Sequence, residues 1–224
     1  MTEASATAEL AGEGLVEARR LPWRQRATEA TLRRDGRRWT LWTAGILVTF
    51  GAPAALVLAL NRWLFPVALV LLAHAWLICR LQAGRAVTSV VPLGSSRAGS
   101  AAAAERVALG LLGDLLAHRE RELLQRTGFA LQTGRLGVWL LGERGALLVR
   151  PDGRRIFSFC VRVGESEDLP GGDRVAHLLL ALREDEQGFA TVANHAFAGA
   201  TWRIRRRLAP VRRPALDAAV RTAA

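Results

Sequence analysis

The chain has 224 residues, a net charge of +11 and a hydrophobic content of 50%, with a mean hydropathy of +0.15. Its two cysteines, Cys79 and Cys160, lie in different segments, which excludes a disulfide framework and a zinc site built from paired cysteines. The sequence also lacks a P-loop, a GxGxxG turn after a predicted strand and an HExxH motif, so no common nucleotide or metalloprotease signature is present.

The N-terminal region, residues 1–38, is expected to pass from a disordered stretch into a basic juxtamembrane segment. Residues 1–15 are rich in Ala, Glu, Thr and Gly, a composition typical of disorder. Residues 16–38 carry a run of arginines with Leu21, Trp23 and Leu32 between them. This run is interpreted as a topology signal, or alternatively as a short helix near 28–34 that lies on an anionic membrane surface.

Residues 39–81 predict a transmembrane helical hairpin. No charge interrupts residues 39–60, which at about 1.5 Å per residue span roughly 33 Å, enough for a hydrocarbon core of about 30 Å. A second apolar segment follows from about 63 to 81, and Arg80 can extend it by snorkelling to the interface. Only Asn61 and Arg62 separate the two segments, so they must run antiparallel.

The arginines predict the orientation of this hairpin. Eight arginines precede the first segment within residues 19–38, and Arg80, Arg85 and Arg97 follow the second, whereas the connecting turn has Arg62 alone. The positive-inside rule therefore predicts a two-pass protein of the cell membrane with both termini in the cytoplasm.

A cleaved twin-arginine signal is the competing interpretation of the same region. Arg33 and Arg34 precede the apolar run, and Ala52-Pro53-Ala54 resembles a small-residue cleavage site. The apolar run continues past Ala54 to Leu60, which favours a membrane-spanning helix instead.

Several residues of the hairpin are candidates for contacts with the membrane or with other helices. Gly51 and Ala55 form a small-xxx-small pair that would let a helix approach closely, and His74 is an ionisable group within the second segment. Aromatic and basic side chains near the segment ends are expected to anchor the hairpin at the interface; these are Trp39, Trp42, Trp63, Arg37, Arg38 and Arg80.

After a linker at 82–100, residues 101–208 predict a cytoplasmic α+β domain. A long helix at 101–126 is expected to pack on an antiparallel β-meander, and residues 209–224 are expected to be a loosely attached tail. The sequence leaves open whether 173–187 is a helix, which is slightly favoured, or half of a hairpin. The predicted strands, separated by turn residues, are 129–133, 136–141, 146–150 and 156–163.

Two sets of residues in this domain suggest chemistry. Cys160 as nucleophile with His177 or His195 as base would make the protein a cysteine-dependent hydrolase. Catalysis is disfavoured, because Cys160 lies mid-strand without a glycine-rich nucleophile turn. If residues 202–207 form a strand, Arg203, Arg205 and Arg207 share one face suited to phosphate. The acidic runs lack calcium-loop spacing, and no metal or cofactor is predicted.

The resulting functional hypothesis is a membrane-anchored cytoplasmic interaction module that binds a protein partner or anionic lipid headgroups. Nucleic acid is disfavoured, because Trp202 would lie on the face opposite the arginines. Two alternatives stay open. One is the cysteine-dependent hydrolase at the membrane; the other is a subunit of a larger membrane complex or a homo-oligomer.

Overall fold

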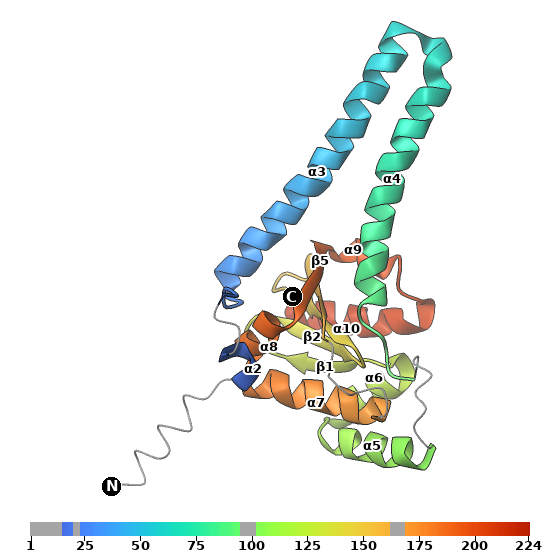
Figure 1. Cartoon of the computed structure of the whole chain (residues 1–224). Coiled ribbons are helices and arrows are strands. Elements are labelled where there is room, and N and C mark those ends of the chain that lie inside the picture. The colour runs from blue at the N-terminus through green and yellow to red at the C-terminus, as the bar shows by residue number, and fades with distance from the viewer. Residues whose placement is uncertain (1–14, 20–22, 95–101, 162–168) are drawn as a thin grey trace.

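The computed structural model describes residues 15–19, 23–94, 102–161 and 169–224. Two long helices, α3 (Glu29–Leu60) and α4 (Phe65–Thr88), are joined by a short 3-10 turn, η1 (Arg62–Leu64). They form an antiparallel hairpin that projects from a mixed domain of helices and one antiparallel sheet (Figure 1). Both helices are long and apolar enough to cross a membrane, and their most apolar windows are only 6% and 11% buried.

Alanines make the close contacts within the hairpin. Ala54 on α3 and Ala68 and Ala75 on α4 are the buried residues of the two apolar segments. Gly51 and Ala55 do not take this role, since Ala55 is exposed and a Cβ at Gly51 would meet nothing within 4 Å. The close contact of α3 with α4 is therefore made by Ala54, next to Ala55. Packing of Gly51 and Ala55 against a further helix stays a prediction.

Both helices extend beyond the predicted apolar segments into the domain. The Thr28 side chain caps α3 by accepting from the Thr31 main-chain N–H, so residues 29–38 of the arginine-rich segment are the first part of α3. Leu32 and Gly36 in these turns are buried against the domain. Residues 82–88, expected to be linker, continue α4, with Ala83 and Ala86 buried. Residues 95–100 of that linker lie outside the described residues.

The sheet has five antiparallel strands in sequence order: β1 (Ala130–Thr133), β2 (Val138–Gly142), β3 (Gly145–Val149), β4 (Arg155–Cys160) and β5 (Asn194–Ala200). The first four confirm the predicted meander, although β4 ends at Cys160 and residues 162–163 lie outside the described part. β5 was not predicted. It pairs with β4 and forms one edge of the sheet.

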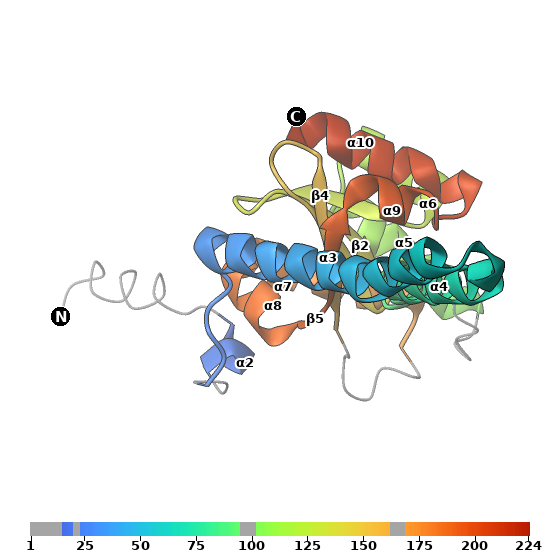
Figure 2. The same cartoon turned by 90° about the horizontal axis from the view of Figure 1, so that it is seen from above.

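Helices cover both faces of the sheet. One face, which carries Trp139, Phe157 and Phe159, packs on helices α5 (Ala102–Asp114), α7 (Gly171–Glu184) and α8 (Glu186–Val192). The other face, which carries Ile156 and Phe197, packs on α10 (Arg213–Ala223) and on the base of α4. Seen from above, α10 and α7–α8 lie on opposite sides of the hairpin (Figure 2).

Two helical predictions for the domain meet different outcomes. The stretch 173–187 is helical, as favoured, except at Asp185. Its acidic run, residues 184–186, marks the break between α7 and α8, because Asp185 caps α8 by accepting from the Gly188 N–H at 2.7 Å. The single helix expected at 101–126 is instead α5 followed by α6 (His118–Thr127), which closes at Gly128 in the left-handed conformation. The first residue of that predicted helix, Ala101, lies outside the described residues.

The C-terminal segment is part of the core, which corrects the expectation of a loose tail. After the short helix α9 (Thr201–Arg205) and the 3-10 turn η2 (Pro210–Arg212), α10 buries Ala215, Leu216 and Ala219 completely. The physical reason is its strong amphipathicity: these three residues recur at i, i+1 and i+4 and form one apolar face.

Candidate functional site

The junction between the hairpin and the domain brings together several of the predicted residues. α3 and α4 lie apart at their domain ends (Figure 1). Both helices contact β5, and α4 also contacts α9. The hairpin thus covers the sheet edge that β5 would otherwise leave exposed, a common way to protect an edge strand.

Trp39 lies across this edge strand and touches both faces of the sheet. In the β4–β5 pairing Ser158 faces Phe197 and Phe159 faces His195, so Ala196 is an extra residue in β5. This bulge turns His195 and Phe197 to opposite faces. The Trp39 ring lies 6.0 Å from the His195 ring and 5.6 Å from the Phe197 ring. Trp39, expected to be an interface anchor, forms a contact between α3 and the domain, and its contact with the membrane interface stays a prediction.

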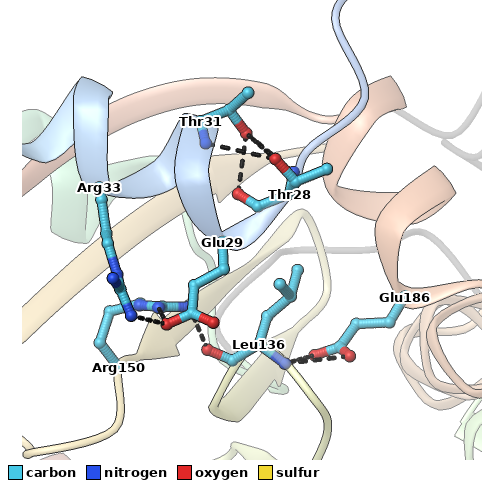
Figure 3. Close-up of polar contacts among 7 residues, drawn as sticks. All are labelled: Thr28, Glu29, Thr31, Arg33, Leu136, Arg150 and Glu186. Atoms are coloured by element: carbon cyan, nitrogen blue, oxygen red, sulfur yellow. Dashed lines mark hydrogen bonds and ion pairs between the residues drawn. The ribbon is translucent and has the colours of Figure 1, made fainter.

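A polar network fixes the first turn of α3 to the loop between β1 and β2. Arg150 donates to Glu29 Oε1 at 3.2 Å and to the Leu136 carbonyl, and the Leu136 N–H donates to Glu186 at 3.0 Å (Figure 3). The Glu186 carboxylate also accepts from the indole N–H of buried Trp139 at 2.6 Å. Arg150 therefore links the start of α3 to the β1–β2 loop of the sheet.

Two domain arginines meet the hairpin where its apolar segments end. Arg155 Nη2 donates to Thr40 Oγ1 on α3 at 3.1 Å, and Arg203 Nη2 donates to the Cys79 carbonyl on α4 at 2.8 Å. Arg155 also fills the space beside Gly36, where an added Cβ would overlap its guanidinium. The Arg203 guanidinium lies over the Phe197 ring, 5.4 Å from its centroid. Both helices thus meet a guanidinium near the domain-side end of their apolar segments.

A cavity of about 550 Å³ opens beside these arginines. One wall is α3, and the opposite wall is the β3–β4 turn with the end of β5. Its main lining residues are Trp39, Thr40, Thr43, Ala44, Leu47, Asp152, Arg154, Arg155, Gly199 and Arg203.

Positive charge predominates in this cavity. Arg154, Arg155 and Arg203 form no ion pair with a carboxylate of any residue that the structure describes. The one lining acid, Asp152, accepts from the Arg154 main-chain N–H at 2.9 Å and so closes its own turn. The site therefore offers three guanidinium groups to an anion.

The predicted row of arginines is not formed. Residues 201–205 are helical, so Arg203, Arg205 and Arg207 do not share the face of a strand. Arg205 pairs with Asp217 at 2.8 Å and, through that hydrogen bond, lowers the pKa of the Asp217 carboxyl. Of the three, only Arg203 lines the cavity. Arg154 and Arg155 were missed, although two arginines directly after a Pro-Asp-Gly turn were a visible signal.

The other expected interface residues are mostly exposed along the hairpin. Trp42 and Trp63 are 55% and 78% exposed, and the Arg80 guanidinium lies over the Trp76 ring at 4.8 Å. Arg37 and Arg38 are exposed at the domain end of α3. His74 Nδ1 donates to the Val70 carbonyl of its own helix at 2.7 Å, and its ring stacks on Phe50. Contact of these residues with lipid stays a prediction.

The structure does not assemble the proposed cysteine–histidine pair. Cys160 follows Ser158 on the β4 face that packs on α4, whereas His195 contacts Phe157 and Phe159 on the opposite face. His177 is exposed on α7 and lines a separate cavity with Leu178.

The His195 ring has the environment of a structural residue. Its Nε2 donates to the Phe197 carbonyl at 3.0 Å, and Asp35 Oδ2 lies 4.0 Å from Nδ1. Burial among the aromatic rings lowers the pKa of this imidazole. Within the described ranges, no group of three His, Cys, Asp or Glu residues is placed to hold a metal ion.

Comparisons with known proteins returned no match to a protein-family model, a curated protein or a solved structure.

Proposed function

We propose that this protein is a membrane-anchored interaction module. In this proposal the hairpin of α3 and α4 crosses a bilayer, and the domain is held in a fixed orientation against the headgroups, where its arginines bind anionic lipid. The observation that carries the proposal is the contact of Arg155 and Arg203 with the domain-side ends of the two apolar segments. Guanidinium groups at that level are suited to the phosphates of a membrane surface.

The exposure of the hairpin supports its insertion. Large apolar side chains are exposed along the length of both helices and are not confined to one patch. They include Leu41, Leu56, Leu69 and Leu72. Apolar surface of this extent is unfavourable in water and favourable in hydrocarbon. The uncharged stretch 39–60 matches the thickness of a bilayer core of about 30 Å.

The distribution of arginines supports one orientation. Arg62 alone lies at the tip of the hairpin, whereas Arg37, Arg38, Arg80 and Arg85 lie at the end near the domain. By the positive-inside rule the domain and both termini face the cytoplasm.

The attachment of the domain has a mechanical consequence. The first turns of α3 and the last turns of α4 bury Leu32, Ala83 and Ala86 in the domain core. The hairpin therefore acts as a rigid base and not as a flexible tether. In this proposal the base holds one face of the domain toward the membrane and leaves the opposite face to a protein partner.

Reconstitution of the full chain tests this function. We expect the protein to float with vesicles of phosphatidylcholine and phosphatidylglycerol and to remain with them after washing at alkaline pH, because a spanning hairpin resists extraction. A protein released by that wash would contradict insertion. Protease digestion of the vesicles should then yield a protected fragment that contains residues 39–79.

A further inference from the structure

We infer that the cavity lined by Arg154, Arg155 and Arg203 is a binding site for one anionic phospholipid, with the lipid phosphate at the guanidinium groups and an acyl chain along α3. This inference rests on the proposed function, because the chain can lie along α3 only if that helix crosses the bilayer. It goes beyond general attraction to a charged surface, since it assigns a single lipid to a defined cavity.

The α3 wall of the cavity changes from polar to apolar along the helix axis. Thr40, Thr43, Ala44 and Leu47 recur at i, i+3, i+4 and i+7, so they form one face of α3. Thr40 and Thr43 donate their hydroxyl hydrogens to the carbonyls of Gly36 and Trp39 at 2.9 Å, which leaves the arginines as the side-chain donors for a ligand at the polar end. Ala44 and Leu47 lie beyond them, inside the uncharged segment.

This polarity matches the order of groups in a phospholipid. The phosphate lies at the level where the apolar segment ends, which is the level of Arg155 beside Thr40 and Arg203 beside Cys79. The acyl chain then covers Ala44 and Leu47. A soluble phosphate would use the same arginines but would leave this apolar wall uncovered, so the geometry favours the lipid over a free phosphate.

The charge of the cavity selects the headgroup. Three guanidinium groups face one carboxylate, Asp152, whose Oδ1 is engaged with the Arg154 N–H. A headgroup that carries its own cation, such as choline, would place a fourth positive group here. A headgroup without a cation, such as glycerol, leaves a net negative phosphate to pair with the arginines.

Arg154 and Arg203 allow a test in which the structural effect is expected to stay local, at α9 and the last turns of α4. Arg154 is exposed, and its side chain forms no hydrogen bond or ion pair with a described residue. Arg203 is tied to α4 by a single hydrogen bond to Cys79. The test variant is therefore Arg154→Gln with Arg203→Gln. The matched control, Arg206→Gln with Arg221→Gln, removes the same charge from exposed residues that do not line the cavity.

The experiment measures retention of phosphatidylglycerol by the full chain in detergent, by native mass spectrometry during titration with this lipid. We expect saturation at one tightly retained lipid. Loss of two charge-assisted contacts should weaken its apparent affinity by about tenfold or more in the test variant, and the control should change it by less than about twofold. Circular dichroism and the thermal midpoint verify that the test variant is folded.

Three outcomes would overturn the inference. One is equal retention by the test and control variants. Another is equally tight retention of phosphatidylcholine. The third is displacement of the lipid by inorganic phosphate, which would assign the arginines to a soluble anion. If the protein still resists alkaline extraction in any of these cases, the membrane anchor stands and only the lipid site fails; a protein that is extracted fails the proposed function first.

Discussion

Arg203 on α9 donates from Nη2 to the main-chain carbonyl of Cys79 on α4, at 2.8 Å. The bond joins a helix of the domain to the point where the second apolar segment ends. The acceptor is a main-chain oxygen inside α4, which also lies in the hydrogen-bond ladder of that helix. The contact therefore depends on the position of α4 and not on the identity of residue 79. This contact and the Arg155–Thr40 bond together fix the domain to both helices of the hairpin.

Loss of the Arg203 side chain should loosen the domain from α4. We expect Arg203→Ala to cost about 1–3 kcal/mol, since it removes a charge-assisted hydrogen bond and the contact with the Phe197 ring. Hydrogen exchange should become faster in α9 and in the last turns of α4, while α7 stays protected. Arg207→Ala, which removes an arginine just beyond α9, is the control; uniform acceleration in both variants would refute a local role.

Trp39 should be a main source of attachment for α3. Trp39→Ala leaves an empty space between the His195 and Phe197 rings, and we expect a loss of about 3 kcal/mol, the low end of the range for buried aromatic residues. Trp42→Ala removes a ring that is 55% exposed and should change the thermal midpoint in detergent much less. Equal effects of the two substitutions would mean that Trp39 serves only as an interface anchor.

Acidification should destabilise the junction through His195. Burial lowers the pKa of this imidazole below its ordinary value of 6.5, and the Phe197 carbonyl and Asp35 only partly oppose that effect. As the pH falls through about 6.5, the unfolded chain binds a proton more readily than the folded one, so stability is present above this pH and is lost below it.

The test compares thermal midpoints at about pH 7.5 and pH 5.5, on either side of the ordinary histidine pKa. His195→Gln keeps a side-chain N–H donor without a titrating ring, and it should reduce the loss of stability at the lower pH. His118→Gln, on an exposed helix, should retain the full dependence. An unchanged dependence in His195→Gln would show that other groups are responsible.

Glu186 should stabilise the sheet by satisfying several donors at once. Its carboxylate accepts from the N–H groups of Arg135 and Leu136 and from the Trp139 indole. An amide offers one acceptor oxygen in place of two, so Glu186→Gln leaves a donor unpaired at a cost of about 1–3 kcal/mol. Glu184→Gln at the exposed end of α7 is the matched control. Equal unfolding midpoints for the two variants would contradict this role.

Much of the fold follows from local patterns in the sequence. The hairpin can be predicted because no charge interrupts residues 39–60 and only two residues separate the apolar segments. Strands β1–β4 are visible because turn residues such as Gly134 and Gly153 punctuate short apolar runs. β5 was missed because Asn194–Ala200 is rich in Ala and Gly, and because the bulge at Ala196 breaks the two-residue alternation that marks a strand.

The candidate site was only partly predictable, because tertiary pairing creates it. The alternation Trp202-Arg203-Ile204-Arg205 resembles a strand, but the segment folds as α9, with Ile204 buried and Arg205 paired to Asp217. Arg154 and Arg155 gain their role only because the β3–β4 turn packs on α3, where Arg155 bonds Thr40 across 115 residues of sequence. No local pattern encodes that contact.

Insertion of the hairpin with the domain in the cytoplasm is tested most directly by labelling introduced cysteines in intact cells with a membrane-impermeant maleimide. In a background of Cys79→Ser and Cys160→Ser, we compare Asn61→Cys at the tip with Ala224→Cys at the C-terminus. We predict that the tip is labelled from outside the cell and that the C-terminus is labelled only after the membrane is opened. Labelling of Ala224→Cys in intact cells, or protection of both positions until the membrane is opened, would contradict the account.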